Sequence, residues 1–239
     1  MTRDSRGLYD AVAVACRMNG DKRVFPFTYE GNTYFVKQHM KHKRWALRWG
    51  NDTFFTEVQR MQDVYTRFRL APEVIIGTAQ FMVTKAGGRP LNEILRQPDA
   101  KELITEAFYA AGRGLATLHA GGYVHGRPAA RDIIYDDVTK EIAFVDWENT
   151  YTIPWIDNRF IDLFLFVQGY FREEIDKRYA LEAALDGYCS VTEGRRLYEQ
   201  VRNYVHAHRT IFEYIGKTQT TGGVDWRSIA MAVALFLAR

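Results

Sequence analysis

The sequence has few cysteines and no long apolar run. Its 239 residues include two cysteines, Cys16 and Cys189, which lie far apart and outside any CxxC or Cys/His cluster. Neither a disulfide framework nor a structural zinc site is therefore expected. The longest apolar runs, "FIDLFLFV" and "IAMAVALFLA", fall well short of the roughly 20 residues that a membrane-spanning helix needs. The apolar part of the N-terminal segment is too short for a secretory signal, so the sequence predicts a soluble protein of a reducing cytoplasm.

Repeats, low-complexity tracts and linkers rich in Pro, Gly or Ser are also absent. With 47% hydrophobic and 26% charged residues, the chain can bury a core as one domain or as two packed lobes. Its net charge of +3 is too small to imply a nucleic-acid partner. The basic stretch, residues 37–49, nevertheless carries five Lys or Arg, two His and two Trp without one acid. It is either a solvated loop or a peripheral contact with an anionic membrane surface on the inner face.

The pattern of elements changes near residue 90. Residues 23–30 and 32–38 alternate in polarity around a turn, which predicts a β-hairpin. Residues 52–68 have helical apolar spacing, and two further short strands are expected at 73–78 and 80–86. Residues 1–19 fit either a helix or a first strand. The front of the chain is therefore predicted to be rich in β-structure.

Beyond that point helical patterns dominate. A long helix is expected to end at the glycine pair 121–122, and a short strand pair should follow within residues 132–147. Later helices are expected in four segments: 159–171, 177–188, 195–215 and 226–238. The whole predicts a single α+β domain with two lobes, a small antiparallel β-rich N-lobe of about residues 1–86 and a mainly helical C-lobe of about residues 87–239.

Four residues carry the chemistry that phosphoryl transfer requires. Such a reaction needs a cation on the nucleotide phosphates and oxygen ligands for magnesium. Lys37 lies at the end of a predicted strand, and Glu57 lies on the next helix, where it can hold the lysine by an ion pair. Asp132 opens the later hairpin and Asp146 closes it. Each aspartate alone could be a turn or capping residue, but the pair predicts a metal clamp.

These segments together resemble the protein kinase-like fold, in a small bacterial form similar to the Kdo and heptose kinases of the lipopolysaccharide core. "TYFVK" resembles the lysine strand, "FFTEV" the glutamate helix, and "IAFVDWE" the magnesium motif. "QFMVTKAGGRPLNEIL" resembles the hinge, so the resemblance implies that Thr84, Lys85 and Ala86 bind the nucleotide. "LATLHAGGYVHGRPAARDIIY" resembles the catalytic helix and loop. Asp162 in "RFIDLFLF" resembles the buried aspartate that braces that loop.

The loop departs from the kinase pattern H-x-D-x-x-x-x-N. When His125 is aligned with the histidine, Arg127 takes the place of the working aspartate and Asp132 that of the asparagine. A guanidinium cannot accept a proton, but it can bind a phosphate of ATP or of the acceptor. We expect His125 to brace the loop rather than transfer protons.

Two other kinase features are altered. No G-x-G-x-x-G loop precedes Lys37. The loop that covers the ATP phosphates in kinases is therefore expected to be shortened or replaced by another segment. "DWE" replaces Asp-Phe-Gly, with Trp147 expected in the core and Glu148 either a further site carboxylate or an exposed strand-end charge.

The expected function is ATP- and Mg-dependent phosphotransfer to a protein hydroxyl or to a lipopolysaccharide core sugar of a phosphorylated glycolipid. In this hypothesis Lys37 and Glu57 hold the phosphates, Asp132 and Asp146 hold the metal, and Arg127 binds the acceptor or the developing charge. One alternative is a pseudokinase that acts as a nucleotide-binding regulator or scaffold, because the loop aspartate is missing. Another is a kinase-fold nucleotidyl transferase.

Overall fold

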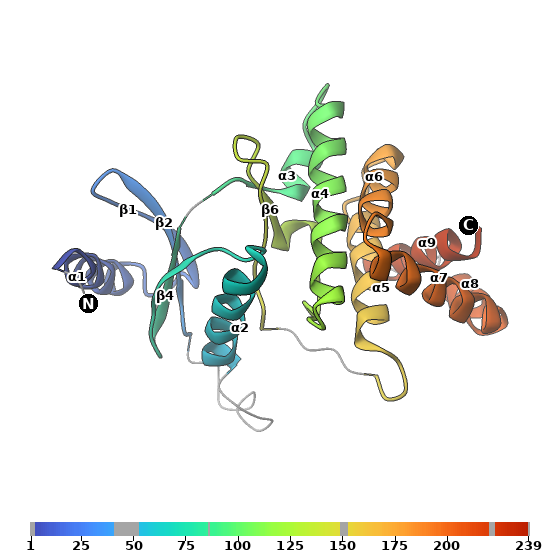
Figure 1. The fold of residues 1–239 in the computed structure, drawn as a ribbon, viewed down its shortest axis with the longest axis horizontal. Helices are drawn as coiled ribbons and strands as arrows, with labels where there is room; N and C mark the ends of the chain where they lie inside the picture. Colours follow the sequence, from blue (N-terminus) through green and yellow to red (C-terminus); the bar gives the residue numbers. More distant parts are fainter. Residues whose placement is uncertain (1–2, 41–52, 86, 149–152, 220–222, 239) are drawn as a thin grey trace. The chain divides into compact units, whose positions relative to one another are not determined.

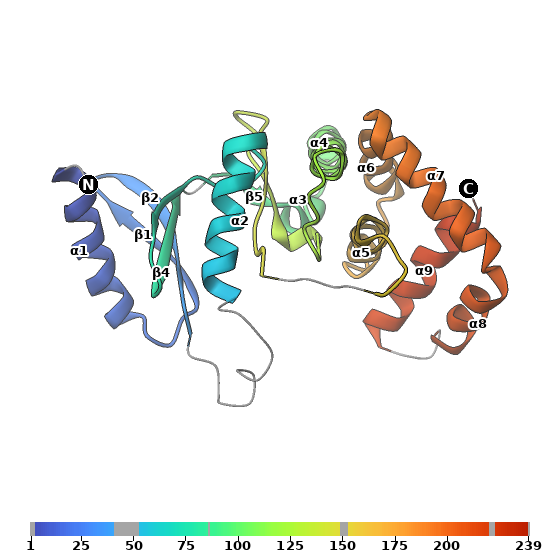
Figure 2. The same ribbon diagram turned by 60° about the horizontal axis from the view of Figure 1, so that its bottom comes forward.

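The computed structural model describes residues 3–40, 53–85, 87–148, 153–219 and 223–238. The chain divides into two compact units, Met1–Gly87 and Gly88–Arg239, which Figures 1 and 2 show in two views. Small antiparallel sheets and many helices confirm the α+β prediction. None of the helices in the described ranges is long and apolar enough to cross a membrane.

The described residues of the first unit form a four-stranded antiparallel sheet and two helices. Its elements are α1 (Arg3–Met18), β1 (Val24–Tyr29), β2 (Asn32–Gln38), α2 (Thr53–Phe68), β3 (Val74–Gly77) and β4 (Phe81–Lys85). The strand order is β1-β2-β4-β3. Both predicted strand pairs and the predicted helix are present. The N-terminal segment, which the sequence left open between helix and strand, forms a helix.

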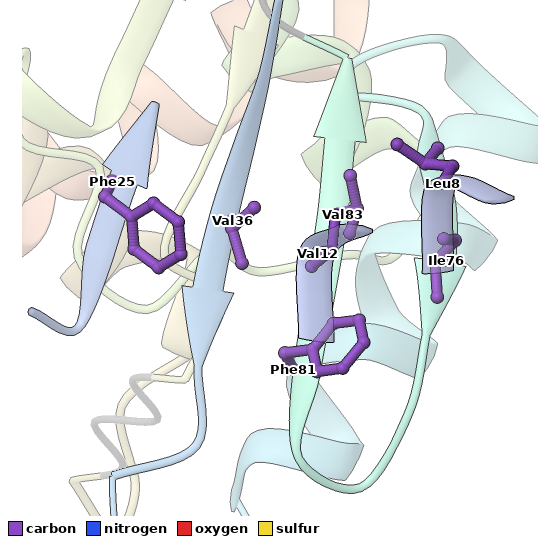
Figure 3. Close-up of a cluster of buried hydrophobic side chains, with 7 residues drawn as sticks. All are labelled: Leu8, Val12, Phe25, Val36, Ile76, Phe81 and Val83. Carbon is purple, nitrogen blue, oxygen red and sulfur yellow. The ribbon is translucent and has the colours of Figure 1, made fainter. Parts of the chain in front are cut away.

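The two helices cover opposite faces of this sheet (Figure 2). Helix α1 packs on one face through a buried apolar cluster that Figure 3 displays: Leu8, Val12, Phe25, Val36, Ile76, Phe81 and Val83. Successive residues of a strand point to opposite faces, so the neighbours of Val36 and Val83 point toward α2. Lys37 and Met82 are paired in the β2–β4 register at this second face. The sheet therefore directs Lys37 toward α2.

The second unit is mainly helical. It begins with β5 (Arg89–Pro90), α3 (Leu91–Leu95) and α4 (Lys101–Ala120), followed by the short strands β6 (Ile133–Tyr135) and β7 (Ile142–Phe144). The remaining helices are α5 (Asn158–Phe171), α6 (Arg178–Cys189), α7 (Thr192–Ala207), α8 (Arg209–Gln219) and α9 (Val224–Ala238). The predicted hairpin gains β5 as a third strand. The segment 195–215, which has a continuous helical pattern, is divided at His208 between α7 and α8.

Helix α4 runs through the middle of this unit, between α3 and α6 in both views (Figures 1 and 2). Its approach to α6 is close because each helix presents a glycine to the backbone of the other. A Cβ atom on Gly112 would lie 1.8 Å from the Ala184 carbonyl oxygen, and one on Gly187 would lie 2.0 Å from the Tyr109 carbonyl oxygen. Any larger side chain at these positions would force the helices apart. This contact places the C-terminal turn of α6, which includes Tyr188, against the middle of α4.

Candidate functional site

Lys37 and Glu57 form the predicted ion pair within the first unit. The Lys37 Nζ atom donates to Glu57 Oε1 over 2.6 Å. The Glu57 side chain is fully buried on α2, and that of Lys37 is 12% exposed. Burying two charges costs solvation energy that their attraction does not necessarily recover, so a buried pair is weak evidence for stability. Its geometry holds one ammonium group at a fixed place on the sheet.

Three neighbouring residues were predicted to bind nucleotide at the end of β4. Thr84 is buried, and its hydroxyl lies 3.5 Å from the Phe35 carbonyl oxygen. Lys85 is exposed at the last position of the strand. Ala86 lies outside the described residues. The nucleotide-binding role of all three stays a prediction.

In the second unit, the buried carboxylate of Asp162 holds the start of the loop that follows α4. Its two oxygens accept hydrogen bonds from the backbone N–H groups of His125 and Gly126, each over 2.7 Å. Gly126 has a φ of +99°, a conformation that side-chain-bearing residues rarely adopt. The expectation that Asp162 braces this loop is confirmed. Helix α5 carries Asp162, so it fixes the position of the backbone from which the Arg127 side chain extends.

A second layer supports Asp162 from the α4 and α6 side. His119 Nε2 lies 3.1 Å from Asp162 Oδ2, and His119 Nδ1 lies 2.6 Å from the Tyr188 hydroxyl. The Asp162 carboxylate accepts, so Nε2 is the donor at that contact, and the Tyr188 hydroxyl donates to Nδ1. Burial raises the pKa of Tyr188 far above its ordinary value, which keeps the hydroxyl proton available for this bond. The brace thus extends from α6 to the loop.

His125 connects the loop to the segment after β7. Its Nε2 atom lies 2.8 Å from the Val145 carbonyl oxygen, so this nitrogen is the donor. The ring packs edge-on against Trp147, with 4.7 Å between ring centroids. The Trp147 indole N–H donates to the Phe144 carbonyl over 2.7 Å, and the side chain is fully buried. The expected core position of Trp147 is confirmed, and His125 has the contacts of a bracing residue.

Asp132 and Asp146 lie at the same end of the β6–β7 hairpin. The register pairs Ile133 with Phe144, and one residue further out the Val145 N–H donates to the Asp132 carbonyl over 2.9 Å. Asp146 follows directly and has a left-handed backbone with a φ of +67°. Such backbone conformations cost energy and cluster at functional sites. The side chains of Asp132 and Asp146 are 11% and 23% exposed.

Arg127 extends its guanidinium to both of these carboxylates. Its Nη2 atom lies 3.8 Å from Asp132 Oδ2 and 3.7 Å from Asp146 Oδ2. Both distances exceed hydrogen-bond length and remain within ion-pair range. Arg131 approaches Asp132 from another direction, with 3.6 Å between Nε and Oδ1. The loop therefore presents a cation at the two predicted metal ligands.

Glu148 brings a further carboxylate to this end of the hairpin. One of its oxygens lies within 4.8 Å of an oxygen of Asp146, and its side chain is partly buried. Of the basic stretch, residues 41–49 lie outside the described residues, as does the rest of the segment up to residue 52. The part that is described includes His39, which stacks on Phe54 at 5.2 Å between ring centroids.

Sequence reasoning missed two residues that support the loop. His119 and Tyr188 lie 69 positions apart, and no local motif connects them. The signal that was available is the pair of glycines, Gly112 and Gly187, which mark a close contact of two helices. That contact packs the C-terminal turn of α6, which carries Tyr188, against α4, the helix whose last turn carries His119.

Comparison with known proteins adds one relative. No family model matches the sequence. The chain is 32% identical over 168 residues to an uncharacterized protein of Haemophilus influenzae, and the match covers 64% of this chain. It spans 65% of that relative, which is just under two thirds of its length. Because the relative is uncharacterized, the similarity brings no activity, substrate or partner to this chain.

Proposed function

We propose that this chain is an ATP-dependent phosphotransferase with a two-lobed kinase-like arrangement, in which the first unit is the N-lobe and the second the C-lobe. The observation that carries the proposal is the ion pair of Lys37 with the fully buried Glu57. A charged pair in such a position adds little to stability, whereas a fixed ammonium suits the phosphates of a nucleotide. The order of the remaining motifs along the chain supports the same reading.

In this proposal the residues of the second unit act around the transferred group. The loop 125–132 is held by Asp162 and by His125, so its side chains start from a fixed backbone. Arg127 cannot act as a base, and its positive charge instead counters negative charge near the phosphates. A loose transition state asks little of a base, so transfer is expected to be slow rather than absent.

The residues present also fit magnesium. Carboxylate oxygens are the ligands that this hard cation prefers, and Asp146 is exposed enough to reach one, with Glu148 nearby. Asp146 would hold the ion, with Glu148 contributing further oxygens, while Asp132, the second ligand expected from the sequence, lies against Arg127. When bound, magnesium would supply positive charge to the nucleotide phosphates. Arg127 limits how a metal ion can bind here, because its guanidinium already lies against both aspartates.

The acceptor is proposed to be a protein hydroxyl or a core sugar of a lipopolysaccharide glycolipid at the inner membrane face. The protein is incubated with Mg-ATP and with each acceptor, and ADP release and acceptor mass are measured. Lys37→Ala and Asp146→Asn should abolish turnover, while Lys140→Ala, which removes an exposed pair with Glu106, should leave it unchanged. Turnover that survives Lys37→Ala would contradict the assignment, and added AMP in place of phosphate would point to nucleotidyl transfer.

The second candidate is a pseudokinase that binds nucleotide and works as a regulatory or scaffold protein. Arg127 favours it, because no proton acceptor stands at that loop position. The same assay separates the two candidates. Saturable ATP binding without ADP release with any acceptor would favour the pseudokinase.

A further inference from the structure

The guanidinium of Arg127 lies near the carboxylates of both Asp132 and Asp146. A single atom, Nη2, lies within 3.8 Å of both Asp132 and Asp146. The three side chains are partly buried, with that of Arg127 27% exposed. Two carboxylates at one hairpin end repel each other, and reduced contact with water strengthens this repulsion. A cation shared by both relieves it.

The backbone around Arg127 keeps this cation in place. Asp162 binds the two preceding N–H groups, and the Arg127 carbonyl accepts from the Ala129 N–H over 2.8 Å. The Arg127 N–H points to His125 Nδ1 at 3.4 Å. A side chain that starts from such a fixed backbone loses less conformational freedom on pairing. The backbone from which the guanidinium extends is therefore held by hydrogen bonds around Arg127.

We propose that Arg127 is the resident counter-ion of Asp132 and Asp146 and takes the place of one divalent cation at this pair. Mg–O bonds measure about 2 Å, so a metal ion between the two aspartates would lie close to Nη2 and be repelled by it. The chain then requires at most one bound cation, on the side of Asp146 that faces away from Arg127. This inference rests on the proposed function for the identity of the cation.

The test is a titration of nucleotide-free protein with Mn²⁺, a spectroscopic substitute for magnesium, with free Mn²⁺ followed by electron paramagnetic resonance. Arg127→Gln should bind Mn²⁺ at least about tenfold more tightly than the wild type, because one positive charge within about 4 Å is removed. Arg127→Lys keeps the charge and should stay within about threefold of the wild type. Equal affinity of the wild type and Arg127→Gln would overturn the proposal.

Arg131→Gln is the matched control. Arg131 also approaches Asp132, but its side chain is 52% exposed and no ion pair joins it to Asp146. Its removal should change Mn²⁺ affinity by less than about threefold, because solvent screens exposed charges. Tightening equal to that of Arg127→Gln would overturn the proposal, since any lost positive charge would then suffice.

A second substitution keeps the proposal testable if Arg127→Gln does not fold. Asp132→Asn in the otherwise wild-type chain should leave Mn²⁺ affinity within about threefold, because Arg127 already neutralises Asp132. A loss of more than about tenfold would show that Asp132 binds the metal in the presence of Arg127, against the proposal. Since no nucleotide is used, failure of this test leaves ATP binding untouched. Failure of ATP binding likewise leaves the Mn²⁺ result standing.

Discussion

The carboxylate of Asp162 accepts a 2.7 Å hydrogen bond from the backbone N–H of Gly126. With the bond from the neighbouring His125 N–H, it satisfies two donors that have no access to water. A buried N–H that loses its partner costs more than an average hydrogen bond contributes. The stability of the loop and the stability of the second unit are therefore coupled through Asp162.

Asp162→Ala should lower the free energy of unfolding by about 3 kcal/mol, because two backbone donors are left unpaired and His119 loses its acceptor. Urea unfolding followed by circular dichroism measures this difference. Asp186→Ala, at an exposed position on α6, is the control and should change it by less than about 0.5 kcal/mol. Equal effects of the two substitutions would show that the buried brace contributes nothing specific.

Gly112→Ala should destabilise the second unit by about 3 kcal/mol or more, because the new methyl group would overlap the Ala184 carbonyl unless α4 and α6 separate. Thermal unfolding measures the loss. Gly87→Ala offers a comparison, since no atom of the described residues lies within 4 Å of a Cβ at that position. That variant should be as stable as the wild type or slightly more stable. A wild-type melting temperature for Gly112→Ala would contradict the close helix contact.

Asp157 caps the N-terminus of α5, the helix that carries Asp162, and accepts from the Arg159 N–H. Asp157→Ala should cost about 1 kcal/mol of unfolding free energy at neutral pH, as the loss of a helix cap does. Asp157→Asn keeps a capping acceptor but loses the charge that pairs with Arg159, so it should cost less. Chemical denaturation at pH 7 measures the free energy of unfolding of each protein. It should be highest for the wild type, lower for Asp157→Asn and lowest for Asp157→Ala.

The same site predicts a pH dependence. Hydrogen bonds from the Arg159 side chain hold the pKa of Asp157 below its ordinary value. The unfolded chain then binds the proton more readily, so the stabilisation is complete above the unfolded pKa, about 3.9, and is lost as pH falls through the lower folded pKa. The gap in stability between wild type and Asp157→Asn should stay constant from pH 7 to about pH 5 and close below about pH 4. A gap that does not change with pH would contradict the ion pair.

Much of the fold could be predicted because its signals are local. The alternation of residues 23–38 gives the β1–β2 hairpin, and the spacing of Phe54, Val58 and Met61 gives the buried face of α2. The contact of Lys37 with Glu57 follows from a strand end and a helix turn that face each other. The N-terminal helix could not be assigned from the sequence, because its β-branched and small residues fit both the helical and the strand periodicity. The break at His208 also has no strong signal, since neither Gly nor Pro marks it.

The arrangement of the candidate site was harder to predict from the sequence. Motif order placed Asp132 and Asp146 at one hairpin, but the direction of a long arginine side chain is set by tertiary surroundings. Sequence reasoning assigned Arg127 to phosphate or acceptor, whereas its guanidinium lies against the two aspartates. The bond of His119 with Tyr188 depends on the packing of α4 on α6. Contacts between residues so far apart in the chain leave no local pattern.

The most direct test of the central claim is a calorimetric titration of the protein with ATP in the presence of magnesium. Wild type should bind one ATP saturably, and Lys37→Ala should bind at least about tenfold more weakly, because the ammonium held by Glu57 is removed. Lys22→Ala, which removes an exposed lysine of the same unit, should match the wild type within about twofold. No binding by the wild type, or equal binding by Lys37→Ala, would contradict the account.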